Sequence, residues 1–107
     1  MAHLESVDEQ GKFEAILKSE KLVVVDFYTQ SCVICKKIEP MLIALRDGLD
    51  SKIDVVKVDA EANLAVAAKY AVRGVPSLML FEGGELKDRK SGFMTALMLR
   101  EWVKAFL

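Results

Sequence analysis

Apolar residues recur along this chain with two different periods, one typical of strands and one typical of helices. Two nearly continuous apolar runs, Leu22–Tyr28 and Ile53–Val58, are typical of strands that are buried on both faces. Ser77–Phe81 and Glu85–Lys90 predict two further strands, and the Gly83-Gly84 pair between them predicts a tight hairpin turn.

Three segments carry apolar residues at the spacing of an amphipathic helix, and a fourth, alanine-rich segment is also predicted to be helical. We expect Ser6 or Asp8 to cap the first of these helices and Thr95 to cap the last. Pro40 falls inside the second and is expected to kink it. The predicted helices cover Val7–Lys18, Cys32–Leu49, Ala62–Tyr70 and the segment after Thr95.

Taken in chain order, these elements predict an α/β fold. If His3–Ser6 supplies a short first strand, strands and helices alternate until the final hairpin and helix. Alternation predicts parallel strands with helices on both faces, and the hairpin adds an antiparallel edge. We therefore expect a three-layer sandwich, with a central mixed five-stranded sheet flanked by four helices, formed by residues 1–107 as a single domain.

Charge and hydropathy exclude several classes of partner. Fifteen Lys and Arg residues against sixteen Asp and Glu give a net charge of −1, which removes the electrostatic basis for binding nucleic acid or an anionic membrane. No apolar segment approaches the roughly 20 residues of a membrane helix, and Met1–Gln10 lacks the apolar core of a signal peptide. The expectation is a monomeric, cytoplasmic protein.

The chain has two cysteines, Cys32 and Cys35, at the start of a predicted helix that directly follows a buried strand. Free amide donors and the positive end of the helix dipole lower the pKa of Cys32 and favour its thiolate. Cys35 lies one turn further into the helix and is expected to be more shielded. Cys32 is therefore predicted to attack a substrate disulfide, and Cys35 to resolve the mixed disulfide.

A CxxC pair beside a βαβ pattern is typical of the thioredoxin-like redox motif, and further motifs extend this likeness. From about residue 20 onwards, the chain resembles the thioredoxin family in the order and spacing of its motifs. The resemblance implies a thioredoxin fold and a protein-disulfide reductase that uses the Cys32–Cys35 disulfide without any other cofactor. The matching residues are Val25–Tyr28, Cys32–Lys36, Pro40, Lys57, Asp59, Lys69-Tyr70, Arg73–Ser77, Phe81, Gly83-Gly84 and Gly92.

The resemblance also implies roles for residues around the cysteines. Asp26 stands in an otherwise apolar strand, where an isolated carboxylate tends to keep its proton. In the family, the matching aspartate lies beneath the disulfide and moves protons to and from the second cysteine, here Cys35. Lys57 matches the lysine that partners this aspartate.

A substrate groove follows from the same resemblance. Pro76 is expected to form a cis peptide bond with Val75 and to face the cysteines. The backbone of Val75 would then pair with an extended segment of the substrate. Gly74 and Gly92 would keep the rim of this groove low enough for another protein to approach.

Three positions depart from the usual family pattern: Ser31 replaces a tryptophan, Val33-Ile34 replaces Gly-Pro, and Phe93 stands where a small residue is common. Val33, Ile34 and Phe93 are expected to form an apolar collar that selects partners. A backbone N–H at Ile34 adds a donor near Cys32, worth about 1–3 kcal/mol or roughly 30–60 mV towards a more oxidising pair. The β-branched side chains also stiffen the loop, with an effect of either sign.

Several functions fit the cysteine pair. The leading hypothesis is a reductase of disulfide-containing target proteins that receives electrons from a thioredoxin-reductase-like flavoprotein. A specialised thiol oxidant or isomerase is an alternative with the same chemistry. In a different class, a dimer sharing Cys32 and Cys35 could bind zinc or an iron–sulfur cluster. A redox-independent docking subunit is the fourth interpretation.

Overall fold

Five strands form one mixed sheet, in the spatial order β1-β3-β2-β4-β5, in the computed structural model, which describes residues 4–6, 10–49 and 51–107. β1 and β2 are each parallel to β3, whereas β4 is antiparallel to β2 and to β5. The prediction of a mixed five-stranded sheet is confirmed. The strands are β1 (Glu5–Ser6), β2 (Leu22–Tyr28), β3 (Ile53–Asp59), β4 (Ser77–Glu82) and β5 (Glu85–Ser91).

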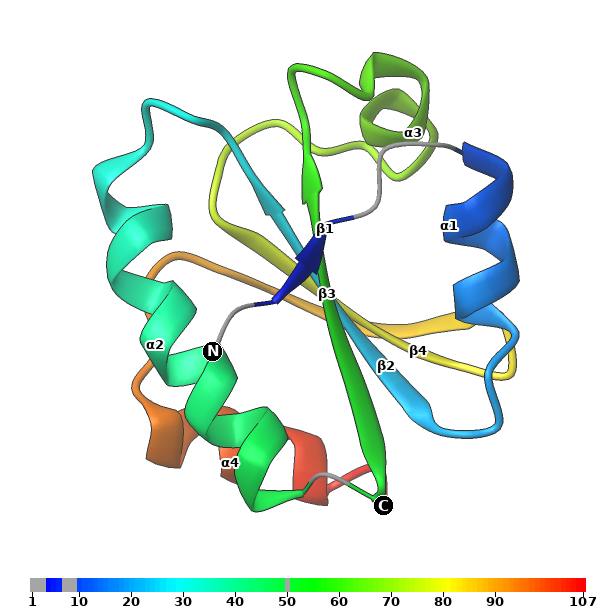
Figure 1. Ribbon diagram of the computed structural model, residues 1–107, viewed down its shortest axis with the longest axis vertical. Helices are drawn as coiled ribbons and strands as arrows, with labels where there is room; N and C mark the ends of the chain where they lie inside the picture. Colours follow the sequence, from blue (N-terminus) through cyan, green and yellow to red (C-terminus); the bar gives the residue numbers. More distant parts are fainter. Residues whose placement is uncertain (1–3, 7–9, 50) are drawn as a thin grey trace.

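Helices cover both faces of the sheet, which completes the predicted three layers. Figure 1 shows α2 and α4 on one side of the strands, and α1 and α3 on the other. Pro40 lies inside α2, and the helix continues past it. Thr95 caps α4 as predicted, since its side chain accepts a hydrogen bond of 3.2 Å from the Met98 N–H. The helices are α1 (Gln10–Leu17), α2 (Val33–Gly48), α3 (Leu64–Lys69) and α4 (Ala96–Lys104).

One expected helix cap and one expected helix start differ in the structure. Ser6 does not cap α1, because it belongs to β1 and pairs with Lys57 of β3; Asp8, the other expected cap, lies outside the described residues. α3 begins later than predicted, because the Asp59 carboxylate binds the backbone N–H groups of Glu61 and Ala62 at 2.9 and 3.2 Å. These contacts hold the chain in a turn before the helix starts.

The alternation of side chains along β2 divides the core into two clusters. Val24 packs between the sheet and the helices α2 and α4, whereas Val23 and Val25 pack on the opposite face with residues of α1 and α3. Side chains two residues apart in a strand share a face. Asp26 therefore lies on the same face as Val24, under α2.

The hairpin between β4 and β5 has the predicted turn. Gly83 and Gly84 have φ values of +61° and +84°, the left-handed conformation that both central residues of a type I′ turn require. Behind this edge of the sheet, Trp102 Nε1 of α4 donates a 2.8 Å hydrogen bond to Asp88 Oδ2 of β5. This bond joins α4 to the edge strand.

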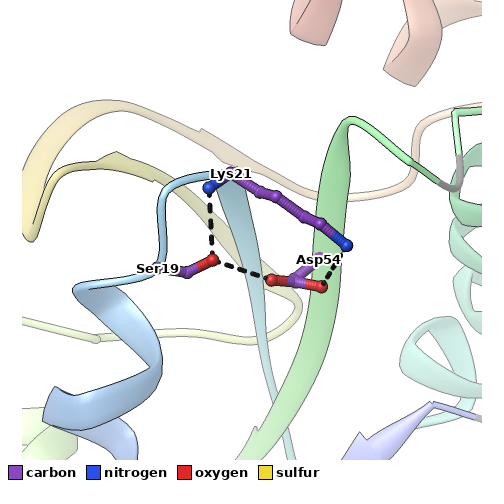
Figure 2. Close-up of polar contacts among 3 residues, drawn as sticks. All are labelled: Ser19, Lys21 and Asp54. Atoms are coloured by element: carbon purple, nitrogen blue, oxygen red, sulfur yellow. Dashed lines mark hydrogen bonds and ion pairs between the residues drawn. The ribbon is translucent and has the colours of Figure 1, made fainter.

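A small polar cluster holds together the ends of the sheet where β2 and β3 begin (Figure 2). Ser19 Oγ donates a 3.1 Å hydrogen bond to Asp54 Oδ2 and accepts one of 3.2 Å from the Lys21 N–H. Lys21 Nζ lies 3.8 Å from Asp54 Oδ1. The cluster links the turn after α1 to β3, at the end of the sheet away from the cysteines, which follow the other end of β2.

Candidate active site

The two cysteines occupy the start of α2, as the sequence predicts. Cys32 is the N-cap residue, with extended backbone angles, and its Sγ accepts a 3.1 Å hydrogen bond from the Cys35 N–H. Cys32 and Cys35 form a disulfide, with their Cα atoms 5.2 Å apart. The sulfur of Cys32 thus lies where the free amides and the dipole of a helix start stabilise negative charge.

The two sulfur-bearing residues differ in exposure. Cys32 is half-buried, whereas Cys35 belongs to the buried core. Cys32 can be approached from solvent, whereas the side chain of Cys35 is shielded from solvent. This asymmetry agrees with the order of attack expected from the sequence.

The loop before β4 lies against Cys32. The Val75–Pro76 peptide bond is cis, which confirms the expectation from the family resemblance. Cys32 Sγ lies 3.9 Å from the Val75 carbonyl oxygen, and the Gly92 N–H donates a 3.1 Å hydrogen bond to the Pro76 carbonyl oxygen. The fold therefore brings together segments that are far apart in the sequence.

A surface groove of about 350 Å³ runs beside this loop, and Gly74, Val75, Pro76 and Gly92 line it. A Cβ atom at Gly74 or Gly92 would meet no other atom within 4 Å. Gly92 has a φ of +85°, a conformation that glycine adopts without strain. Neither glycine places a side chain in the groove.

Asp26 is a buried carboxyl beneath the disulfide end of α2. Its side chain is 2% exposed, and its Oδ1 has no hydrogen-bond partner among the described residues. Burial, reinforced by the negative charge of Glu39 and opposed by the positive charge of Lys57, raises the pKa of Asp26 to about 7. Asp26 and Cys35 line one small cavity of about 190 Å³, which gives this carboxyl access to the second cysteine.

Lys57 is the strand partner of Asp26 in the parallel pair of β2 and β3, but its ion pair is with another residue. Its Nζ lies 2.8 Å from Glu39 Oε1 and 4.9 Å from the centre of the Tyr28 ring. Although burial disfavours its charge, the hydrogen bond and charge of Glu39 raise the pKa of Lys57. The expected partnership of Lys57 with Asp26 is therefore a neighbouring charge and not a direct ion pair.

Glu39 is the site residue that the sequence analysis missed. It lies one helical turn after Cys35 and lines the same cavity as Asp26, Cys35 and Lys57. Residues four apart share one face of a helix. The spacing from Cys35 is the signal that could have found it.

Three large apolar side chains that neighbour the cysteines or the groove in the sequence are exposed. Val33 and Ile34 begin α2 and are 62% and 42% exposed, and Phe93, which follows Gly92, is 46% exposed. Apolar side chains that remain in water near a reactive group are typical of a protein-binding surface.

Other features of the described part of the chain lie away from the disulfide. A larger cavity of about 790 Å³ is lined by residues of β1 and β3, and by Lys21 and Arg46, but by neither cysteine. Within residues 4–6, 10–49 and 51–107, no group of three or more His, Cys, Asp or Glu residues is arranged to bind a metal ion. No helix in these ranges has the length and apolar character needed to span a membrane.

Known proteins share this fold and sequence pattern. The Thioredoxin family model matches residues 4–105. The chain is 35% identical over 98 residues to a thioredoxin of Rickettsia bellii, covering 92% of this chain and 93% of that protein. It is 33% identical over 102 residues to a thioredoxin of Rhodospirillum rubrum, covering 95% and 98%.

A solved structure is also similar to this chain. A mutant thioredoxin from Halobacterium salinarum superposes with a TM-score of 0.90 at 30% identity, covering 98% of this chain and 91% of that one. The chain therefore belongs to the thioredoxin family of protein thiol–disulfide oxidoreductases, whose redox-active group is the protein's own disulfide and which need no external cofactor.

Proposed function

We propose that this protein reduces disulfides of other proteins, with Cys32 as the nucleophile and Cys35 as the resolving thiol. The observation that carries this proposal is the asymmetry of the pair. Cys32 is accessible, and its Sγ accepts a hydrogen bond from the Cys35 N–H at the start of α2, whereas Cys35 is buried. An accessible thiolate stabilised by a helix start is the form that attacks a disulfide.

The proposed reaction starts from the dithiol form of the protein. The Cys32 thiolate attacks one sulfur of the substrate disulfide, and the other substrate sulfur leaves as a thiolate that takes up a proton. Cys35 then loses its proton and attacks Cys32 Sγ. The second substrate sulfur leaves, and the substrate gains two electrons while Cys32 and Cys35 form their disulfide.

Asp26 is the group that we propose to take the proton from Cys35 and to return it in the reverse reaction. A general base works best when its pKa lies near the working pH. The pKa of about 7 for Asp26, caused mainly by burial, and the shared cavity with Cys35 support this role. Lys57 contributes a positive charge that limits the rise of this pKa.

The groove beside Pro76 is proposed to bind the substrate. An extended segment pairs with the backbone of Val75, the residue whose carbonyl oxygen lies 3.9 Å from Cys32 Sγ. Gly74 and Gly92 keep the groove open, and the exposed side chains of Val33, Ile34 and Phe93 contact the partner around it.

Thioredoxin-family proteins act on disulfide-containing targets and are reduced by thioredoxin-reductase-type systems. We propose that a flavoprotein of this kind returns two electrons to the Cys32–Cys35 disulfide after each cycle. The chain acts as one domain and as a monomer in this proposal. Its cytoplasmic location stays a prediction.

Reduction of insulin disulfides tests the activity and the electron donor together. The protein should accelerate the reaction first with dithiothreitol and then with NADPH and a thioredoxin reductase. Replacing both Cys32 and Cys35 with serine should abolish both reactions. Full cellular function of that double variant would contradict the catalytic role and favour a docking subunit.

A further inference from the structure

We propose that Glu39 is a positioning residue of this active site, which holds the Lys57 ammonium group away from the Asp26 carboxyl. The inference rests on the proposed role of Asp26 in proton transfer. It concerns a residue of α2 that the family motif around the cysteines does not include.

The register of the sheet gives Lys57 two acidic neighbours. Asp26 and Lys57 are partners in the parallel pair of β2 and β3, so their side chains lie on the same face. Glu39 lies above that face on α2. Lys57 Nζ contacts Glu39 Oε1 at 2.8 Å, while Asp26 Oδ1 has no hydrogen-bond partner among the residues described.

Desolvation explains why Lys57 binds Glu39 and not Asp26. The side chains of Lys57 and Glu39 are 24% and 31% exposed, whereas Asp26 is almost fully buried. An ion pair that keeps contact with water loses less hydration than one formed with a buried carboxylate. The Tyr28 ring, 4.9 Å from Lys57 Nζ, also favours the outer position of the ammonium group.

Few other charged groups face Asp26. On β4 its register partner is the apolar Leu78. From α2 it faces Cys35 and Glu39, and from β3 it faces Lys57; the exposed Lys36 and the phenol of Tyr28 also line the cavity. The charge that acts on Asp26 thus depends on which of two carboxyl groups, Glu39 or Asp26, binds the Lys57 ammonium group.

The presence of Glu39 has two effects that act in the same direction. Its negative charge raises the pKa of Asp26, and its ion pair keeps Lys57 from forming a direct contact that would lower this pKa. Both effects keep Asp26 protonated up to neutral pH. Replacing Glu39 with an uncharged residue removes both at once.

Titration of the Asp26 carboxyl by ¹³C NMR in the oxidised protein tests the inference directly. Glu39→Gln should move the midpoint of Asp26 down by about one pH unit, a tenfold change in proton binding. Lys57→Met should move it upwards, because the remaining positive charge is lost. Glu101→Gln, an exposed glutamate of α4, is the matched control and should leave the midpoint in place.

The outcomes separate this inference from the proposed function. A midpoint that is the same in Glu39→Gln and Glu101→Gln, or that rises in Glu39→Gln, overturns the role of Glu39. If the midpoint falls while the pH profile of insulin reduction stays in place, Asp26 is not the group that transfers protons in turnover. That second result leaves the effect of Glu39 on Asp26 standing.

Discussion

The sulfur of Cys32 lies 3.9 Å from the carbonyl oxygen of Val75, 43 residues further along the chain. This contact places a backbone acceptor at the edge of the disulfide. In the proposed binding mode, a substrate strand that pairs with Val75 would bring its own sulfur next to Cys32 and away from the buried Cys35. Binding and attack would then be directed to the same cysteine.

Replacing the second cysteine should trap the substrate on the first. In Cys35→Ser, the Cys32 thiolate can attack but nothing resolves the product, so a mixed disulfide accumulates and insulin turnover falls to the uncatalysed rate. Non-reducing electrophoresis and mass spectrometry of the adduct measure this. Cys32→Ser should form no such adduct; adducts through Cys35 would reverse the assigned roles.

The Ile34 amide should make the pair more oxidising. Cys32 Sγ accepts the Cys35 N–H in the disulfide form, and the Ile34 N–H is a further free donor at the helix start that can stabilise the thiolate. A proline at this position removes that donor. We expect Ile34→Pro to lower the reduction potential by roughly 30–60 mV.

Equilibration with a dithiothreitol or glutathione series gives this potential. The wild-type value should lie above the about −270 mV of thioredoxin, and Val33→Gly, which keeps the Ile34 amide, is the control for loop stiffness. A wild-type potential at or below that figure would remove the role of the Ile34 amide. A much higher potential would favour the thiol oxidant or isomerase over the reductase.

Elements with strong local signals could be predicted from the sequence. The apolar run of β2 and the Gly83-Gly84 turn are each marked by the residue types of their own segment, and both are observed where expected. One of the two expected caps of α1, Ser6, was wrong. Ser6 is a good helix cap, but pairing with β3 is a tertiary contact that overrides this preference.

The same distinction between local signals and tertiary contacts applies to the active site. Cys32, Cys35 and Pro76 could be identified because each has a residue type that its chemistry or conformation requires. The partner of Lys57 could not, because two carboxyl groups lie within reach and the choice between them follows from their burial and from the Tyr28 ring. Burial of a charged residue depends on how α2 packs over the sheet, which no local pattern encodes.

Phe93 should contribute to partner binding and not to chemistry. It is exposed and directly follows Gly92, which lines the groove. Burying it against a partner is worth about 1 kcal/mol, or roughly a fivefold change in affinity. Phe93→Ser should raise KM for a protein substrate and leave kcat and the reaction with dithiothreitol unchanged. Leu107→Ser, another exposed apolar residue, is the control. Equal effects of both substitutions would rule out a specific contact.

Asp26 should make the folded protein less stable as the pH rises. Burial raises the pKa of this carboxyl from 3.8 to about 7, so its contribution to stability is fully present below pH 3.8 and is lost as the pH rises through about 7. Between pH 5 and 8, the oxidised wild type should lose roughly 2–3 kcal/mol of unfolding free energy relative to Asp26→Asn. Denaturant unfolding at the two pH values measures this, with Glu101→Gln as the control that should follow the wild type. A constant difference between wild type and Asp26→Asn would mean that Asp26 does not hold its proton in the folded protein.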